Sequence, residues 1–201
     1  AVGAPEPDIA VAIVDPASCR ILPDGQIGEI WVDSPSKAAG YWGLPEQSAA
    51  TFQARAHGSD RAWLRTGDVG FRRDGQLYIT GRLKDMIIVR GRNIAPNDVE
   101  RAVREHPAVR PGGIAAFAVR EGGEEHIGIV VELKDPTPTA TDAVARDVLA
   151  RVADLWPLPR TTVWLAPPRS VHKTTSGKVR RAATRTALLA GDVDVLGQWR
   201  A

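Results

Sequence analysis

The sequence predicts an α+β fold in which a small, mostly β unit precedes a compact unit with a short antiparallel sheet flanked by helices. Up to about Thr80, short β-rich runs alternate with Asp-Pro and Asp-Gly turns, which is typical of antiparallel strands. After this point, helical and strand patterns alternate. Between the two patterns, the stretch 81–100 carries charges that a passive linker does not need. These observations predict one unit at 1–81, a hinge at 82–85 and a second unit at 86–201.

The first unit should contain strands joined by tight turns and one short helix. Its first β-rich run ends at Asp15-Pro16, a turn pair. Glu29 lies in the second run and faces away from its apolar neighbours, because side chains alternate along a strand. Arg73-Asp74-Gly75 has the composition of a hairpin turn. The predicted elements are strands at 9–14, 27–32, 69–71 and 77–80 and a helix at 46–54.

The second unit should alternate helices and strands. Asn97 is the predicted N-cap of its first helix, with Glu100 three residues later as in a capping box. A charged, Gly-rich turn at 121–125 should join two strands as an antiparallel hairpin. Asp142 lies in the first turn of a further helix, where the helix dipole favours a carboxylate. The predicted elements are a helix ending at His106-Pro107, strands at 114–119, 127–133 and 161–165, loops at 135–138 and 170–178, proline boundaries at 158–159 and 167–168, and helices from 141 and at 179–189.

Length and composition place the chain among folded globular proteins. It has 201 residues, of which 43% are apolar, enough for one large or two small domains. Its 26 basic and 24 acidic residues leave a net charge of +2, so no general attraction to nucleic acid is expected. No apolar run reaches the roughly 20 residues of a membrane-spanning helix. Cys19 is the single cysteine and cannot form an internal disulfide, so we expect a reducing compartment, the cytoplasm by default.

The first residues also carry information. Residues 1–20 lack the charged-then-apolar layout of a signal peptide. The first residue is alanine rather than methionine, and no helix or strand pattern occurs before Ile9. We therefore expect a piece of a longer protein.

Asp68 is the first candidate site residue. It stands in Thr66-Gly67-Asp68-Val69-Gly70, where glycines allow the backbone to approach a ligand closely. Its carboxylate can accept two hydroxyl hydrogen bonds, as a ribose diol would supply. The alternative is a turn aspartate that accepts hydrogen bonds from local N–H groups.

Arg82 and Lys84 form the second candidate group. They are two residues apart, so in an extended segment their side chains would point to the same side. A rotation of the linker would then move both together. The alternative is a solvated cluster of charges.

Lys178 is the third candidate. It ends the segment Lys173–Lys178, KTTSGK, whose glycine and small hydroxyl residues predict a mobile loop that brings an ammonium group to a phosphate or a developing oxyanion. A phosphate-binding P-loop is excluded, because His172 occupies the position of the required glycine and Val179 follows the lysine. The alternative is an exposed basic residue at a helix N-cap.

Other kinds of site have no support in the sequence. The chain has no nucleophile elbow and no GxGxxG motif, and its histidines lack the spacing of metal ligands. We therefore expect no metal site in this chain. The histidines are His57, His106, His126 and His172.

Several motifs in one order resemble the C-terminal part of the adenylate-forming superfamily, which includes acyl-CoA synthetases, luciferases and the adenylation domains of peptide synthetases. Together they cover nearly the whole chain. The matching segments are 40–52 (GYxxxPExTxxxF), 65–68 (RTGD), 81–84 (the hinge motif), 90–100 (RGRNI with Pro96 and Glu100) and 173–178 (the PKTxSGK ending).

Within that superfamily, the segments around 40–52 and 83–100 look most like fatty acyl-AMP ligases. The resemblance implies an enzyme that activates a fatty acid with ATP as its adenylate and passes the acyl group to an acyl carrier protein or a polyketide synthase. It implies Mg²⁺ as well, with ligands expected in an N-terminal region that this sequence does not contain.

The resemblance also implies a role for each candidate residue. Asp68 should bind the ribose hydroxyls of ATP, and Arg82 should contact the ribose or the phosphates. Lys84 should be the pivot between the end of the adenylation domain, 1–81, and a mobile lid, 86–201. Lys178 should bridge the carboxylate and the α-phosphate during adenylation. Rotation about the pivot would withdraw Lys178 afterwards.

Two departures from the family pattern bear on these roles. His172 replaces the usual proline of the PKTxSGK ending. The family's ATP loop, its YGxTE motif and its fatty-acid tunnel belong to the N-terminal region, so this chain should be inactive alone.

Two alternatives remain. The first is an acyl-CoA ligase of the same superfamily. The second is a non-catalytic module that docks an acidic carrier protein through basic residues. These are Lys173, Lys178, Arg180, Arg181 and Arg185.

Overall fold

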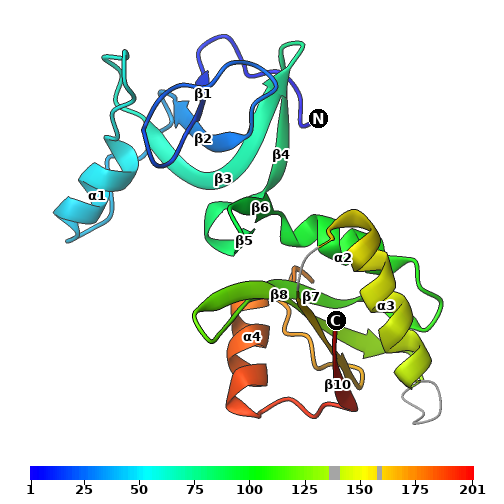
Figure 1. Cartoon of the computed structure of the whole chain (residues 1–201). Coiled ribbons are helices and arrows are strands. Elements are labelled where there is room, and N and C mark those ends of the chain that lie inside the picture. Colours follow the sequence, from blue (N-terminus) through cyan, green and yellow to red (C-terminus); the bar gives the residue numbers. More distant parts are fainter. Residues whose placement is uncertain (136–140, 158–159) are drawn as a thin grey trace. The chain divides into compact units, whose positions relative to one another are not determined.

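The computed structural model describes residues 1–135, 141–157 and 160–201. The chain divides into two compact units, Ala1–Lys84 and Asp85–Ala201. Figure 1 labels their helices and strands along the chain. The predicted loop at 135–138 falls mostly outside the described residues, and the predicted boundary at 158–159 falls wholly outside them.

The first unit is a four-stranded antiparallel sheet with one helix. The strands pair in chain order, β1-β2-β3-β4. Its core is formed by small apolar residues around two buried tryptophans, Trp31 and Trp63. The elements are β1 (Ala10–Val14), β2 (Gly28–Asp33), α1 (Pro45–Phe52), β3 (Leu64–Arg73) and β4 (Gln76–Arg82).

The strand predictions for this unit are confirmed, although β3 and β4 are longer than predicted. Asp74-Gly75 turns the chain between them, with φ +50° at Asp74 and +73° at Gly75. The chain then enters a short 3₁₀ turn, Leu83–Asp85. The expectation of an extended segment through Arg82 and Lys84 is wrong, because the strand ends at Arg82 and the backbone curls directly after it.

The second unit is built on a four-stranded sheet with the order β10-β9-β8-β7. A separate two-stranded hairpin joins β5 and β6. The elements are β5 (Ile87–Val89), β6 (Arg92–Ile94), α2 (Pro96–Arg104), β7 (Val109–Glu121), β8 (Glu124–Leu133), α3 (Thr141–Leu155), β9 (Thr161–Ala166), α4 (Arg181–Ala190) and β10 (Gly197–Arg200).

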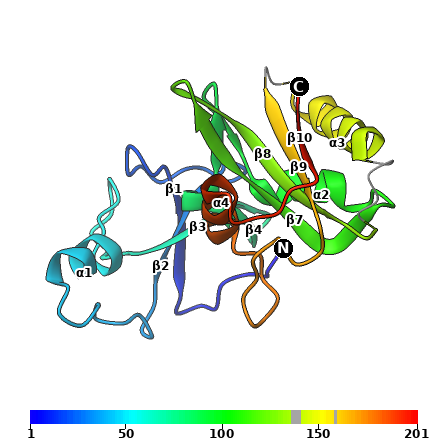
Figure 2. The ribbon, with the colours of Figure 1, turned by 90° about the horizontal axis from the view of Figure 1, so that it is seen from below.

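Helices cover both faces of this sheet. Figure 2 shows α3 and α4 on opposite sides of the strands. Helices α2 and α3 pack on one face, over a core that includes Ile127, Ile129 and Val131. Helix α4 packs on the other face, near Phe117 and Trp164. Because side chains alternate along a strand, β7, β8 and β9 each contribute to both cores.

The α+β class is confirmed, with one refinement to the predicted antiparallel sheet. Strands β7 and β8 pair antiparallel, but β8 and β9 pair parallel. Helix α3 lies between β8 and β9 in the sequence, and such a helical crossover is what a parallel pair requires. The short edge strand β10 was not predicted.

The prediction of Asn97 as a helix N-cap is wrong. Helix α2 begins at Pro96, and Ala95 is the N-cap without a side-chain hydrogen bond. Proline suits the first helical position because its φ is already helical and its missing N–H needs no partner there. Glu100 is therefore not part of a capping box, and its carboxylate binds elsewhere.

Candidate functional site

Asp68 and Arg82 lie side by side on adjacent strands. They are register partners in the β3–β4 pair, and Asp68 Oδ1 is 2.8 Å from Arg82 Nε. Asp68 is half-buried and Arg82 is exposed. The structure thus brings together two of the predicted site residues. The alternative of a turn aspartate bound to local N–H groups is wrong, since Asp68 lies within a strand and its carboxylate binds a guanidinium.

A buried carboxylate holds the backbone beside Asp68. Glu29 in β2 is 2% exposed. Its Oε2 accepts hydrogen bonds from Arg65 Nε (3.0 Å) and Nη2 (2.7 Å), and its Oε1 accepts one from the Gly67 N–H (3.2 Å). Gly67 has φ +71°, a conformation that glycine adopts without steric cost. Sequence reasoning treated Glu29 as an outward strand residue and missed this role.

Thr66 completes the local arrangement. Its hydroxyl donates to the carbonyl of Ile30 (2.7 Å) and accepts from the Asp68 N–H (3.0 Å). The Thr66 side chain therefore ties the Asp68 backbone to the neighbouring strand. Glu29 binds the N–H of Gly67, and Thr66 binds the N–H of Asp68, so the backbone that carries the Asp68 side chain is fixed. The Asp68 carboxylate is also held directly, by its ion pair with Arg82.

Lys84 is exposed and is the last residue of the first unit. It lies in the 3₁₀ turn rather than on the strand that carries Arg82. The division of the chain into units falls directly after it, between Lys84 and Asp85. Its role as a pivot remains a prediction.

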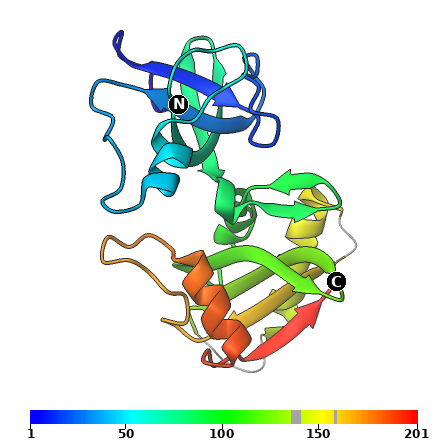
Figure 3. The ribbon, with the colours of Figure 1, turned by 90° about the vertical axis from the view of Figure 1, so that its left-hand side faces the viewer.

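Lys178 lies in a narrow hairpin before α4, visible in Figure 3 as the orange loop leading into that helix. Lys173 and Val179 form an antiparallel bridge, and the Thr174 N–H donates to the Lys178 carbonyl (2.9 Å). The Gly177 N–H donates to the Thr174 carbonyl (2.9 Å), and Gly177 has φ +81°. The lysine is thus part of a hydrogen-bonded turn.

The Lys178 side chain is exposed, and no ion pair to it is found in the described part of the chain. The alternative of a helix N-cap residue is wrong for Lys178, because Arg180 is the N-cap of α4. Asp68 and Arg82 belong to the first unit and Lys178 to the second. The predicted site is therefore divided between the two units.

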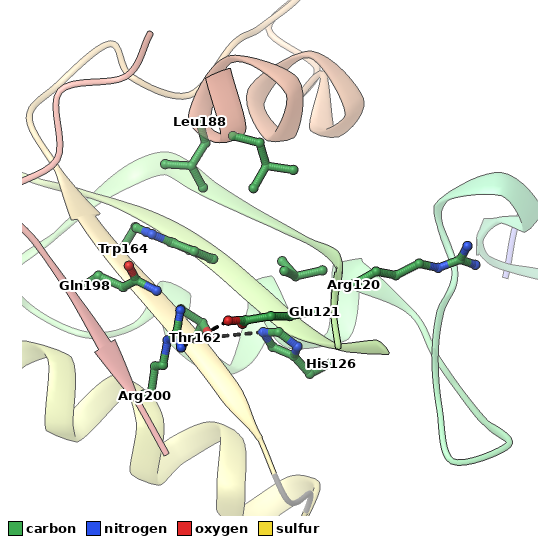
Figure 4. Close-up of a pocket in the computed structure, with 10 residues that line it drawn as sticks. Arg120, Glu121, His126, Thr162, Trp164, Leu188, Gln198 and Arg200 are labelled. Carbon is green, nitrogen blue, oxygen red and sulfur yellow. Dashed lines mark hydrogen bonds and ion pairs between the residues drawn. The ribbon is translucent and has the colours of Figure 1, made fainter. Parts of the chain in front are cut away.

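A cavity of about 350 Å³ lies in the second unit between α4 and the ends of the strands. Figure 4 shows His126, Thr162, Trp164 and Leu188 around it. His126 is 2% exposed, and its Nε2 is 3.0 Å from Thr162 Oγ1. None of the four predicted site residues lines this cavity. Sequence reasoning gave His126 no role.

Asp68 and Arg82 offer hydrogen-bonding groups of opposite charge. Within residues 1–135, 141–157 and 160–201, no group of three or more His, Cys, Asp or Glu is arranged to hold a metal ion. The Asp68 carboxylate and the Arg82 guanidinium can bind hydroxyl and phosphate oxygens respectively.

Among residues 1–135, 141–157 and 160–201, none of the helices has both the length and the hydropathy of a membrane-spanning segment.

Comparison with known proteins identifies the family. The chain is 41% identical over 203 residues to the medium-chain-fatty-acid–[acyl-carrier-protein] ligase JamA of Moorena producens, a match that covers 99% of this chain. The chain belongs to the adenylate-forming superfamily. It corresponds to the C-terminal part of fatty-acid ligases and spans about a third of their length, 34% in the case of JamA.

Other adenylate-forming relatives support this assignment. The putative fatty-acid–CoA ligase FadD21 of Mycobacterium tuberculosis is 42% identical over 184 residues, with 86% of this chain and 31% of FadD21 covered. Among solved structures, a fatty acyl-adenylate ligase from a study of the Escherichia coli and Legionella pneumophila enzymes matches with a TM-score of 0.77 and 30% identity. The match covers 94% of the present chain and 32% of the chain in the solved structure. No family model matches the chain.

We predict that Arg65→Ala destabilises the first unit by about 2–3 kcal/mol. This change would leave the Glu29 carboxylate buried without its cationic partner, and the loss should fall below that of a fully buried pair because Arg65 is one-third exposed. The control is Arg61→Ala, which breaks an exposed pair with Asp33 and should cost at most about 1 kcal/mol. Urea unfolding measures both, and equal losses would contradict the prediction.

We also predict that His126 makes the second unit acid-sensitive. Burial lowers the pKa of His126 from its usual 6.5, and the guanidinium of Arg160 lowers it further. Because the folded state binds the proton less readily than the unfolded state, stability should fall as the pH drops below about 6.5, by at most about 1.4 kcal/mol per pH unit. Thermal unfolding at pH 7.5 and 5.5 measures the loss. His126→Gln should remove the part of this loss that comes from His126. If the variant showed the same pH dependence as the unchanged protein, His126 would not be its cause.

Proposed function

We propose that the whole protein is an ATP-dependent fatty acid adenylating enzyme that forms acyl-AMP and passes the acyl group to an acyl carrier protein. The relatives support the adenylating class, and JamA is a ligase for an acyl carrier protein by name. The present chain would supply the end of the adenylation domain and the lid. It would be inactive alone, and it would act in the cytoplasm.

In this proposal the first unit binds the nucleotide. The Asp68 carboxylate accepts hydrogen bonds from the ribose hydroxyls, and Arg82, held beside it, contacts the ribose or the phosphates. Mg²⁺ accompanies the ATP phosphates, and its protein ligands lie outside this chain. The half-buried position of Asp68 leaves its carboxylate accessible to a ligand.

The second unit supplies the charge that adenylation requires. A carboxylate oxygen of the fatty acid attacks the α-phosphorus of ATP, the bond to the β-phosphate oxygen breaks, and pyrophosphate leaves. Lys178 lies between the carboxylate and the α-phosphate and stabilises the negative charge that these groups share in the transition state. The observation that carries this proposal is the exposed, unpaired ammonium group of Lys178 on an ordered hairpin within the described residues.

The boundary after Lys84 supports a change of position between the two steps. In the proposal, the second unit rotates about Lys84 once the adenylate has formed, withdraws Lys178 and admits the acceptor. The carrier protein would then be acylated through a thioester, with AMP as the leaving group.

We predict that Lys178→Ala in the full-length protein lowers the rate of adenylation by two to three orders of magnitude, since one stabilising charge at the transition state would be lost. Pyrophosphate release with fatty acid and ATP measures it. Lys134→Ala is the control, because Lys134 is an exposed lysine of the same unit outside the proposed site. Undiminished pyrophosphate release in Lys178→Ala would contradict the proposed role.

The acceptor and the docking alternative are tested together. We expect the preformed adenylate of the full-length protein to be consumed by acyl carrier protein and not by CoA, whereas the reverse would make the protein an acyl-CoA ligase. Titration of this chain with carrier protein at two salt concentrations then examines docking. Binding without ATP that weakens with salt would favour a docking module, because electrostatic attraction between exposed charges is screened.

A further inference from the structure

The hairpin that carries Lys178 is anchored at both ends by carboxylates from other elements. Within residues 172–180, the bonds that define the hairpin run mainly between its own two strands and its turn. Two contacts tie the hairpin to the rest of the unit: the His172 N–H donates to Thr184 Oγ1 of α4 (3.0 Å), and Val179 packs against the core beneath that helix. The chain on either side of the hairpin is held at Val171 and Arg181, which carry its two ends.

Glu132 holds the first end. This residue of β8 is fully buried, and its Oε1 accepts a hydrogen bond from the Val171 N–H (2.7 Å). Its Oε2 accepts one from Arg110 Nη1 (2.7 Å). A buried carboxylate is costly unless its oxygens are paired, and both oxygens of Glu132 are committed. The chain thus enters the hairpin at a fixed point on the sheet.

Glu100 holds the second end. Arg181, the first residue of α4, donates from Nε to Glu100 Oε1 (2.7 Å) and from Nη2 to Glu100 Oε2 (2.7 Å). This two-pronged arrangement fixes both distance and orientation. Glu100 Oε1 also accepts from the Ala116 N–H of β7 (3.1 Å), so the carboxylate itself is held. Arg181 Nη1 lies 3.5 Å from Asp85 Oδ2, the first residue of the unit.

Electrostatics agree with this geometry. Arg181 and Glu100 are both mostly buried. The hydrogen bonds and charge of Glu100, together with Asp85, raise the pKa of Arg181 despite its burial. The Arg181 guanidinium therefore keeps its charge in this buried position. Because charge-assisted bonds of this kind are short and directional, they resist displacement of the start of α4.

We propose that Glu132 and Glu100 are positioning residues for Lys178. The inference rests on the proposed function, in which the Lys178 ammonium has to lie between two reacting groups. Neither carboxylate would touch the substrate. Each would act by fixing one end of the hairpin, because a displacement of about 1 Å at a reacting group can cost about 100-fold in rate.

The test uses Glu132→Gln and Glu100→Gln in the full-length protein. We expect adenylation, measured as pyrophosphate release, to fall roughly 10- to 100-fold with little change in the KM for ATP. Acyl transfer from a preformed adenylate should change less than about 3-fold, because Lys178 has no part in that step. Asp98→Asn is the matched control. Asp98 lies in α2, the helix that carries Glu100, and forms an exposed ion pair with Arg101.

Double variants separate positioning from general loss of structure. If each glutamate acts through Lys178, then adding Glu132→Gln or Glu100→Gln to Lys178→Ala should cause no further loss of adenylation, because coupled changes are not additive. Full additivity, or equal losses in adenylation and acyl transfer, would mean a merely structural role and would overturn the proposal. If Glu100→Gln does not fold, Arg181→Lys takes its place, since it keeps the charge and removes the two-pronged bond to Glu100. If Glu132→Gln does not fold, Arg110→Lys takes its place, since it keeps the charge and removes the guanidinium that binds Glu132 Oε2.

The same experiments distinguish the inference from the proposed function. If Lys178→Ala adenylates normally, the proposed function fails. If Lys178→Ala is impaired while Glu132→Gln and Glu100→Gln are fully active, the role of Lys178 stands and the positioning proposal alone is overturned.

Discussion

Buried carboxylates that bind backbone N–H groups are the constraint on which both candidate site segments depend. In the first unit, Glu29 accepts from the N–H of Gly67, beside Asp68. In the second, Glu132 accepts from the N–H of Val171, at the entry to the hairpin. Each carboxylate also accepts a hydrogen bond from an arginine guanidinium, whose charge offsets the cost of burying the carboxylate. Each carboxylate thereby fixes a backbone amide close to a candidate site residue.

The division of the chain separates two kinds of chemistry. The first unit offers a carboxylate and a guanidinium suited to hydroxyl and phosphate oxygens, and the second offers an exposed ammonium group. Neither set is a complete catalytic site. Relatives that share these segments are about three times longer, and this chain spans about a third of their length. The described cavities are not lined by Asp68, Arg82 or Lys178.

Short-range patterns predicted most of the fold, and long-range contacts account for what they missed. Alternating apolar residues and an Asp-Gly turn identified β3 and β4 because strand periodicity and turn chemistry are local. The ion pairs of Glu29 and Glu100 were not predictable, since their arginine partners lie 36 and 81 residues away in sequence. The prediction that Asn97 caps α2 was wrong because the helix already begins at Pro96, and no side chain caps it. Asp68 and Arg82 were found by motif, but only the β3–β4 register shows that they meet.

The parallel pair β8–β9 makes the entropic cost of strand pairing uneven within the second unit. Strands β7 and β8 are joined by a tight turn, so their pairing requires little loss of chain entropy. Strand β9 pairs with β8 across the long connection that contains α3, and β10 pairs with β9 across the segment that contains α4, so both pairs close longer loops. Within the four-stranded sheet, the β7–β8 pair thus closes the shortest loop, whereas the Lys178 hairpin lies in the long segment that joins β9 to β10.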